Sequence, residues 1–365
     1  MKKTTIKKIG VLTAGGDCPG LNAVIRAIVK IATEKYNIKV IGFKDGYEGL
    51  IHNRFVSLGN REASGILTMG GTILGTSNTA APYRYAVTKG KKFIYQDVSK
   101  KAIANYKKNK LDALITIGGD GTLSTALKLQ RDGLNIVGVP KTIDNDLSGT
   151  DLTFGFDSAF TTATEAIDKL HTTAQSHHRV MIVEVMGRYA GWIALFSGMA
   201  GGGDVILIPE IPYGIENICA KIKERKIRGK RFSIIVVAEG AKPVGGELTV
   251  SQIVERSFDQ IRLGGVASRL AEEIERRTLI ECRATILGHV QRGGIPTPAD
   301  RVLATRYGAE AVDMVLKGEF GRMAALQGNK IVNIPLQKAV GKLKLVPLDS
   351  GLIRSLKKMG VSFGD

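Results

Sequence analysis

Two short stretches of the chain carry the residue types best suited to chemistry. The motif GGDGT at residues 118–122 offers glycine N–H groups that can hold phosphate, and one carboxylate, Asp120, that can hold a metal ion. The motif PKTIDND at residues 140–146 offers a lysine, a hydroxyl and two carboxylates. Transfer of a phosphoryl group to an alcohol requires these groups. Together the two motifs indicate a kinase.

Within the second motif, Asp144 is the candidate general base, because its carboxylate can accept the proton of an attacking hydroxyl. Thr142 would fix the substrate, and Asp146 would hold Asp144 in place or contact the water shell of a metal ion. The alternative for residues 144–146 is an acidic turn bound to its own backbone. The alternative for Asp120 is a cap of the following helix.

Another glycine loop, GGD at residues 15–17, separates a predicted strand from a predicted helix. Such a loop lets the backbone approach phosphate closely at a helix N-terminus. Its alternative is a tight turn with no ligand. Cys18 follows directly, where a thiol near a helix start can be reactive, but we expect a packed and inert thiol.

The elements that position these loops follow from the apolar pattern. The runs at residues 8–12, 111–117 and 136–139 are typical of buried strands, and each precedes one of the three loops. Because a doubly wound sheet binds ligands beyond the carboxyl ends of its strands, we expect the loops to open onto one crevice. Further strands are predicted at 180–185, 204–208, 232–238 and 285–290, and helices at 23–32, 123–129 and 192–199. This alternation predicts an α/β fold with two doubly wound, Rossmann-like domains.

The number of predicted strands exceeds one sheet, so the chain is divided near residue 154. We predict one domain from residues 1–154 plus about 292–335, and a second from 155–291 plus about 336–365. The stretch 281–294 would return the chain to the first sheet. Residues 79–110 are predicted to be a loop followed by one amphipathic helix.

Composition narrows the functional classes. The 365 residues are 44% hydrophobic and 24% charged, as in an ordinary soluble protein. The net charge of +18 makes a nucleic-acid-binding protein the natural alternative to an enzyme. Its lysine-rich stretches, such as residues 100–110, lack interleaved aromatic residues and a recognition-helix pattern, so nucleic-acid binding is not expected.

The remaining composition points to a cytoplasmic protein. Three cysteines are far apart and show no metal spacing, which favours a reducing compartment. The first residues lack the apolar core of a signal peptide. We find no apolar stretch long enough to span a membrane, so no membrane partner is expected.

Five motifs, taken in order, carry a resemblance to a known family. They are GGD at 15–17, GGDGT at 118–122, TIDND at 142–146, EVMGR at 184–188 and GHVQRGG at 288–294. Over nearly its whole length the chain resembles a 6-phosphofructokinase of the bacterial type. GGDGT alone also resembles the loop of NAD kinases and diacylglycerol-type lipid kinases, which are the more remote alternatives.

The resemblance implies phosphorylation of the 1-hydroxyl of fructose 6-phosphate, giving fructose 1,6-bisphosphate in glycolysis, with Mg²⁺ and ATP. Asp144 would be the proton acceptor and Asp120 the Mg²⁺ ligand. The first predicted domain would bind the donor and Mg²⁺, and the second would bind fructose 6-phosphate. The implied catalytic residues are Asp144, Thr142, Lys141 and Arg188. The implied donor-binding residues are Gly16, Asn78, Thr79, Gly119, Asp120, Gly121 and Thr122. The implied sugar-phosphate residues are Thr142, Asp144, Arg179, Met186, Gly187, Arg188, Glu239, Arg283, His289 and Arg292.

The resemblance also implies a homo-oligomer, either a dimer or a tetramer. Arg179 and Arg283 match arginines that the family supplies from a neighbouring subunit. An arginine suits the 6-phosphate because its planar fork binds bidentately. The alternative for each arginine alone is a surface ion pair.

The phosphoryl donor is where the chain departs from the family pattern. Gly121 leaves room for a nucleotide, whereas the family's pyrophosphate users commonly have an aspartate there. Lys141 stands where the ordinary ATP enzymes have glycine, and Asn78 where the family has a bridging arginine. We expect ATP, with pyrophosphate as the alternative, and either Lys141 or Arg84 compensating for Asn78.

Four residues fall on the family's effector positions. Arg26, Lys30 and Asp204 match residues of that site in regulated relatives. His171 stands where those relatives usually have an arginine, so no regulation is predicted.

Overall fold

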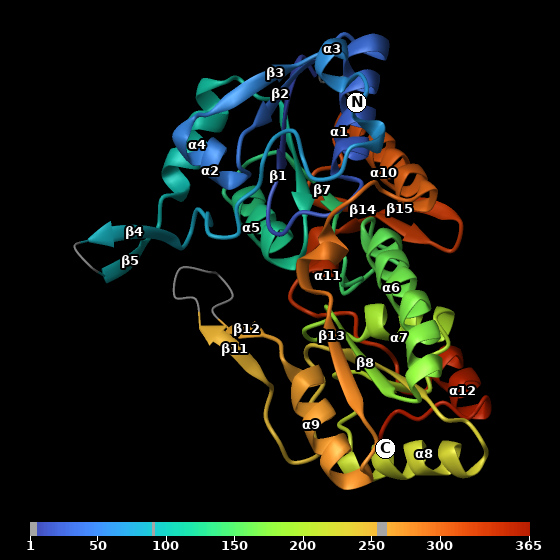
Figure 1. Cartoon of the computed structure of the whole chain (residues 1–365). Coiled ribbons are helices and arrows are strands. Elements are labelled where there is room, and N and C mark those ends of the chain that lie inside the picture. The colour runs from blue at the N-terminus through green and yellow to red at the C-terminus, as the bar shows by residue number, and fades with distance from the viewer. Residues whose placement is uncertain (1–5, 90–91, 254–260) are drawn as a thin grey trace.

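The computed structural model describes residues 6–89, 92–253 and 261–365. Two parallel-rich sheets lie one above the other in the view of Figure 1, each covered by helices. Among the described residues, no helix is both long and apolar enough to cross a membrane.

The first sheet has seven strands in the order β15-β14-β7-β6-β1-β2-β3. Its strands are β1 (Lys8–Thr13), β2 (Lys39–Phe43), β3 (Phe55–Leu58), β6 (Ala113–Gly118), β7 (Ile136–Pro140), β14 (Arg322–Gln327) and β15 (Lys330–Pro335). The inner strands are parallel, and β3 and β15 pair antiparallel at the two edges. Strands β6 and β7 are buried along their whole length because helices cover both faces, as the continuous apolar runs predict.

Two hydrophobic clusters mark the two faces of this sheet. One cluster contains α1 (Leu21–Lys30) and α10 (Pro298–Lys317), which pack against each other. The other contains α2 (Tyr47–His52), α4 (Ser99–Lys108), α5 (Asp120–Arg131) and α11 (Leu336–Ala339). Short turns complete this half: η1 (Ile31–Lys35), α3 (Asn60–Ala63) and η2 (Ile66–Thr68).

The second sheet has four parallel strands in the order β13-β8-β10-β9. These are β8 (Val180–Val185), β9 (Val205–Leu207), β10 (Ser233–Ala238) and β13 (Cys282–Ile286). One face packs against α6 (Phe156–His177), α7 (Trp192–Ala200) and α12 (Gly351–Lys358), the other against α8 (Ile215–Ile227) and α9 (Val266–Thr278).

Two of the sequence-based predictions about elements are wrong. The predicted loop over residues 79–110 contains a hairpin, β4 (Tyr85–Lys89) and β5 (Lys92–Gln96), before α4 begins. The strand predicted at 285–290 is displaced, since β13 ends at Ile286 and residues 288–292 form the 3₁₀ turn η3 (Gly288–Arg292). Gly288 has a φ of +50°, which a strand does not accommodate.

A second hairpin, β11 (Val250–Ile253) and β12 (Ile261–Leu263), belongs to the lower half of the molecule in Figure 1. The first sheet draws its strands from residues 8–140 and 322–335, and the second from residues 180–286. The division into two domains at the predicted boundaries stays a prediction.

Candidate active site

Three loops meet at the carboxyl edge of the first sheet. They follow β1, β6 and β7, and they correspond to the three motifs at residues 15–17, 118–122 and 140–146. From the adjacent pair β1 and β6 the chain continues in opposite directions, to β2 on one side and β7 on the other. This is the topological switch point at which open α/β sheets bind ligands.

The GGDGT motif forms the start of α5. Asp120 is the first residue of the helix, so the neighbouring N–H groups have no partner within the helix and point toward the crevice. Residue 118 has room only for glycine, because a Cβ there would lie 2.3 Å from Cβ of Thr122. Gly119 lies beside the third loop, where a Cβ would lie 3.9 Å from Cβ of Thr142. Gly121 lies in the first turn of α5, close to the same crevice.

Lys141 belongs to the third loop, and its side chain reaches the first loop. Its side chain is nearly fully buried, and its Nζ donates a hydrogen bond to the carbonyl oxygen of Gly16. Burial lowers the pKa of this lysine, and the nearby Arg292 lowers it further, while Asp17 and Asp144 oppose the shift. The lysine therefore places its amine where the loop of residues 140–146 meets the loop of residues 15–17.

Asp144 and Asp146 form an acidic pair beside this cation. Burial raises the pKa of Asp144, whereas Arg292 and Lys141 lower it. Burial, followed by the charge of Asp144, raises the pKa of Asp146 to about 7, and Asp120 adds to the shift. Asp146 is thus within electrostatic range of both Asp144 and Asp120, and a bound cation would offset this repulsion.

The turn between the two aspartates is fixed by Asn145. This residue has a left-handed φ of +50°, which asparagine tolerates better than most residues. Its Oδ1 accepts a hydrogen bond from the N–H of Thr153 at 3.1 Å. Thr142 Oγ1 accepts a hydrogen bond from the N–H of Asp144 at 3.1 Å, which fixes the hydroxyl beside the candidate base.

The carboxylates suit a magnesium ion held jointly with phosphate. Among residues 6–89, 92–253 and 261–365, no three metal-ligating side chains are grouped so that they could hold a metal ion by themselves. Magnesium usually keeps several waters and binds one or two carboxylates plus substrate phosphates. Asp120, at a helix start and within electrostatic range of Asp146, fits that pattern.

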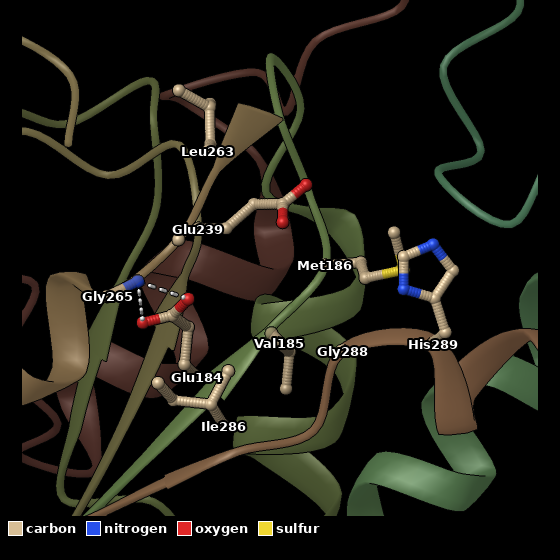
Figure 2. Close-up of a pocket in the computed structure, with 10 residues that line it drawn as sticks. Glu184, Val185, Met186, Glu239, Leu263, Gly265, Ile286, Gly288 and His289 are labelled. Carbon is tan, nitrogen blue, oxygen red and sulfur yellow. Dashed lines mark hydrogen bonds between the residues drawn. The ribbon is translucent and has the colours of Figure 1, made fainter. Parts of the chain in front are cut away.

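The second sheet presents its own loops at the carboxyl ends of its strands. A pocket of about 380 Å³ opens there (Figure 2). Figure 2 shows Glu184 and Glu239 on one side of it, with Met186 and His289 on the other. The lining residues are Glu184, Val185, Met186, Glu239, Leu263, Gly264, Gly265, Ile286, Gly288 and His289.

Close backbone packing shapes this pocket. Gly187 has a φ of +138°, and a Cβ on Gly240 would lie 1.9 Å from the carbonyl oxygen of Arg188, so both positions require glycine. The N–H of Met186 donates to Oε1 of Gln291 at 3.3 Å, which joins the loop after β8 to η3. The guanidinium of Arg188 lies 4.9 Å from the ring centroid of Tyr189.

Arg292 joins the two sheets. Its Nη1 donates to the carbonyl oxygen of Asp17 at 3.1 Å, so an arginine of the GHVQRGG motif contacts the first glycine loop. A Cβ on Gly16 would lie 2.5 Å from the same nitrogen. The positive charge of Arg292 also lowers the pKa values of Asp144 and Glu239. The two carboxyl edges therefore face each other across one site.

Arg179 and Arg283 lie elsewhere. Arg179 precedes β8 whereas Met186 follows it, so the two ends are separated by the strand's length, roughly 20 Å. Both arginines pair with Glu281, Arg179 at a distance of 2.7 Å. They do not reach the pocket of their own chain.

The loop that carries Asn78 and Thr79 rests on the first glycine loop. The N–H of Gly15 donates to the carbonyl of Ser77 at 3.2 Å, and both Asn78 and Thr79 are exposed. Arg84 lies farther along the chain, where its guanidinium stacks 4.3 Å from the ring centroid of Tyr95.

Two further expectations concern residues outside the crevice. Cys18 is fully buried, which confirms the expected packed thiol, and burial raises its pKa to about 12. At the effector positions, Asp204 is paired with Arg225 at 2.6 Å, and His171 Nε2 donates to the carbonyl of Gly201 at 2.6 Å. Arg26 and Lys30 are residues of α1.

Comparison with known proteins decides the family. The model of the family described as Phosphofructokinase matches residues 8–315. The chain belongs to the phosphofructokinase family. ATP-dependent 6-phosphofructokinase 2 of Clostridium perfringens is 54% identical over 364 residues, covering 99% of each chain. ATP-dependent 6-phosphofructokinase of Spirochaeta thermophila is 47% identical over 365 residues, covering 100% of each.

Solved phosphofructokinases share the fold. The Pichia pastoris enzyme in the T-state has a TM-score of 0.79 at 33% identity, covering 92% of this chain and 35% of that longer one. Pyrophosphate-dependent phosphofructokinase from Marinobacter aquaeolei has a TM-score of 0.80 at 22% identity, covering 98% and 92%, which shows the fold alone. The predicted α/β class with two doubly wound halves is confirmed.

Sequence reasoning missed two residues that shape the candidate site. Glu184 is fully buried, and its carboxylate accepts hydrogen bonds from the N–H groups of Gly265 and Ala267 at 2.9 to 3.1 Å. Lys344 holds the loop that carries Asp144. A single glutamate inside an apolar strand was the available signal for Glu184, whereas Lys344 carries no local signal in the sequence.

Proposed function

We propose that this phosphofructokinase-family chain phosphorylates fructose 6-phosphate at its 1-hydroxyl, using Mg²⁺ and ATP and yielding fructose 1,6-bisphosphate. The observation that carries the proposal is the meeting of the two carboxyl edges. Arg292, from the GHVQRGG motif, contacts the first glycine loop. Its charge lowers the pKa values of both Asp144 and Glu239. The relatives named ATP-dependent 6-phosphofructokinase match this chain from end to end.

In the proposed reaction, the Asp144 carboxylate takes the proton of the 1-hydroxyl. The hydroxyl oxygen forms a bond to the γ-phosphorus as the bond to the bridging oxygen breaks, and the electron pair leaves on ADP. Lys141 and Arg292, whose positive charges both lower the pKa of Asp144, would stabilise the charge that develops on the transferred group. Thr142 would orient the sugar beside the base.

The donor side is assigned to the first sheet. The N–H groups at the start of α5 and the loop of Gly16 would hold the phosphates, with Asn78, Thr79, Gly119, Gly121 and Thr122 around them. Asp120 would hold Mg²⁺, and Asp146 would contact its water shell. When bound, Mg²⁺ would neutralise charge on the donor phosphates.

The acceptor side is assigned to the second sheet. Met186, Gly187, Arg188, Glu239 and His289 would surround the sugar phosphate in and beside the 380 Å³ pocket. Arg179 and Arg283 would reach the same kind of pocket in a neighbouring subunit, since they are too far from their own.

The exposed edge of the second sheet supports this oligomer. Strand β13 is an edge strand, and Arg283 and Ile286 are exposed along it, as are Val290 and Ile295 in the segment that follows. Exposed apolar residues beside an open strand edge are typical of an interface. A homo-oligomer, dimer or tetramer, in a cytoplasmic setting stays the prediction.

Pyrophosphate is the second candidate donor because of Lys141. This buried amine reaches the loop of Gly16, where it would supply part of the positive charge that the family's arginine provides and Asn78 lacks. Arg84 is the weaker candidate for that role because it stacks within the hairpin.

Steady-state kinetics with fructose 6-phosphate, comparing Mg-ATP and Mg-pyrophosphate, test the function and the donor together. We expect the efficiency with ATP to be the higher. Comparable efficiency with both donors would overturn the donor assignment, and no product with either would overturn the function.

The variant Lys141→Met keeps the length of the side chain and removes its charge. If Lys141 takes over part of the missing arginine's role, kcat with the preferred donor falls about 10-fold to 1,000-fold, as for loss of one transition-state donor. Arg84→Met is the matched control and should keep kcat within about twofold. The same kcat in Lys141→Met and wild type would refute the role of Lys141.

A further inference from the structure

A C-terminal segment lies along the loop of the candidate base. We name residues 341–346, which follow α11, the C-terminal strap. Leu343 forms an antiparallel β-bridge with Leu147, and the N–H of Lys344 donates to the carbonyl of Asp146 at 2.8 Å. The hydroxyl of Ser148 donates to the carbonyl of Lys342 at 2.6 Å. The strap is therefore paired with the last residue of the acidic motif, Asp146, and with the two residues that follow it.

The side chain of Lys344 closes this arrangement. Its Nζ donates to Oδ1 of Asn145 at 3.0 Å and to the carbonyl oxygens of Thr150 and Asp151, both at 2.9 Å. An ammonium has three donors, so all of them are satisfied by one loop. The backbone of Lys344 is held in turn by Trp192, whose Nε1–H donates to the main-chain carbonyl of Lys344 at 2.8 Å.

The acceptors of Lys344 explain why it matters to the site. Asn145 is the left-handed residue between Asp144 and Asp146, and its Oδ1 also accepts the N–H of Thr153. The amine thus joins the turn that carries both carboxylates to the far end of the same loop, at Thr150. Without it, these oxygens lose a charged donor in a half-buried setting and the turn loses a restraint.

The strap contacts two other parts of the site. The N–H of Gly341 donates to Oδ1 of Asp120 at 2.8 Å. The N–H of Val346 donates to Oε1 of Glu210 at 2.8 Å, and Glu210 follows β9 of the second sheet. One short segment therefore contacts the proposed metal ligand, the turn of the proposed base and the opposite half of the molecule.

We infer that Lys344 is a positioning residue for phosphoryl transfer: its amine holds the Asn145 turn so that Asp144 and Asp146 keep their places opposite Asp120. The inference rests on the proposed function. It predicts an effect on the chemical step rather than on the binding of either substrate, since Lys344 lies outside the pocket of the sugar and the glycine loops of the donor.

The test compares Lys344→Met with Lys342→Met. Both remove one positive charge from the strap, but Lys342 is exposed and only its backbone carbonyl serves the loop. We expect Lys344→Met to lower kcat about 10-fold to 100-fold, as for a misplacement of about 1 Å, with both KM values within about threefold. Lys342→Met should keep wild-type kinetics.

A third variant covers the case in which Lys344→Met does not fold. Lys344→Arg keeps the charge, but its planar fork does not match three convergent acceptors, so kcat should lie between those of wild type and Lys344→Met. Wild-type kcat in Lys344→Met, or in Lys344→Arg if the methionine variant is unfolded, would overturn the inference. A rise in KM at unchanged kcat would also overturn it. Failure of the wild-type chain to phosphorylate fructose 6-phosphate would instead count against the proposed function.

Discussion

Burial and nearby charges act in opposite directions on the pKa of the candidate base, Asp144. Burial raises the pKa of Asp144, and two cations, Arg292 and Lys141, lower it. A base must be ionised to accept a proton yet basic enough to hold it, so a carboxylate balanced in this way suits the role. Burial, followed by the negative charge of Asp144, raises the pKa of Asp146 to about 7.

The variant Asp144→Asn tests the base directly. It keeps the shape of the side chain and removes the proton acceptor, so we expect kcat to fall about 100-fold to 10,000-fold. Both KM values should change little because the loop geometry is kept. Steady-state kinetics check this, and a loss below about fivefold would exclude Asp144 as the base.

Glu239 predicts a pH dependence of stability. Burial, with the charges of Asp144 and Glu184, raises the pKa of Glu239 from 4.5 to about 7. Between those two values the folded state keeps a proton that the unfolded state has released. The free energy of unfolding therefore falls as the pH rises through this window, by about 1–3 kcal/mol from this residue.

The variant Glu239→Gln lacks that titration. We expect its melting temperature, relative to wild type and without substrates, to increase from pH 5 to pH 8. Thermal melts in a matched buffer series check the sign. A difference that does not change with pH would show that Glu239 titrates normally.

At the scale of elements, the site depends on how α9 begins. Glu184 lies on β8, and its buried carboxylate accepts the N–H of Gly265 at the start of α9 (Figure 2). The same carboxylate also accepts the N–H of Ala267. A negative charge at a helix N-terminus is stabilising, and three bonds to one buried group fix the approach of the helix. Because Gly265 also lines the pocket, this contact sets the pocket's wall.

Removing the contact should affect both stability and sugar binding. We expect Glu184→Ala to lower the free energy of unfolding by about 2–3 kcal/mol, since buried donors are left without a partner. The KM for fructose 6-phosphate should rise more than the KM for the donor. Denaturant unfolding and kinetics measure the two effects, with Glu184→Gln, which keeps an acceptor oxygen, as the milder control. Equal changes in both KM values would argue against a local role.

The sequence predicts those elements best whose pattern is local. The runs before the glycine loops are buried on both faces and so are continuously apolar, and β8 begins and ends where predicted. The β4–β5 hairpin was missed because its strands are short and flanked by lysines. Lys344 was missed because its partners lie almost 200 positions earlier, and only the fold brings them together.

At the scale of the whole molecule, the two sheets meet along their carboxyl edges, and α6 and α10 connect them. The carboxylate of Asp300, in α10, accepts the N–H groups of Gly155 and Ser158 at the start of α6 at 2.8 to 2.9 Å. One subunit therefore supplies the proposed base, the proposed donor loops and the proposed sugar pocket. It does not supply Arg179 or Arg283, which lie at the opposite end of the second sheet.

If a neighbour completes the site, two defective variants should complement each other. Mixed subunits of Asp144→Asn and Arg283→Ala contain one site with an intact base and an intact arginine. With random two-fold pairing, about half of the pairs are mixed, and one of the two sites in each mixed pair is intact. About a quarter of all sites are then intact. We expect the activity of a refolded one-to-one mixture to approach that fraction of the wild-type value.

The matched control mixes Asp144→Asn with Lys141→Met. These two residues come from the same chain of any site, as the contacts of Lys141 with the Asp144 loop and with Gly16 require, so no mixed pair regains an intact site. Mixing them should give no more than the average of the two parents. Recovery with Arg283→Ala but not with Lys141→Met can arise only if the arginine crosses between subunits. If neither mixture regained activity beyond the average of its parents, Arg283 would not complete a neighbour's site. Its role would then be the exposed ion pair with Glu281, which contributes little to stability.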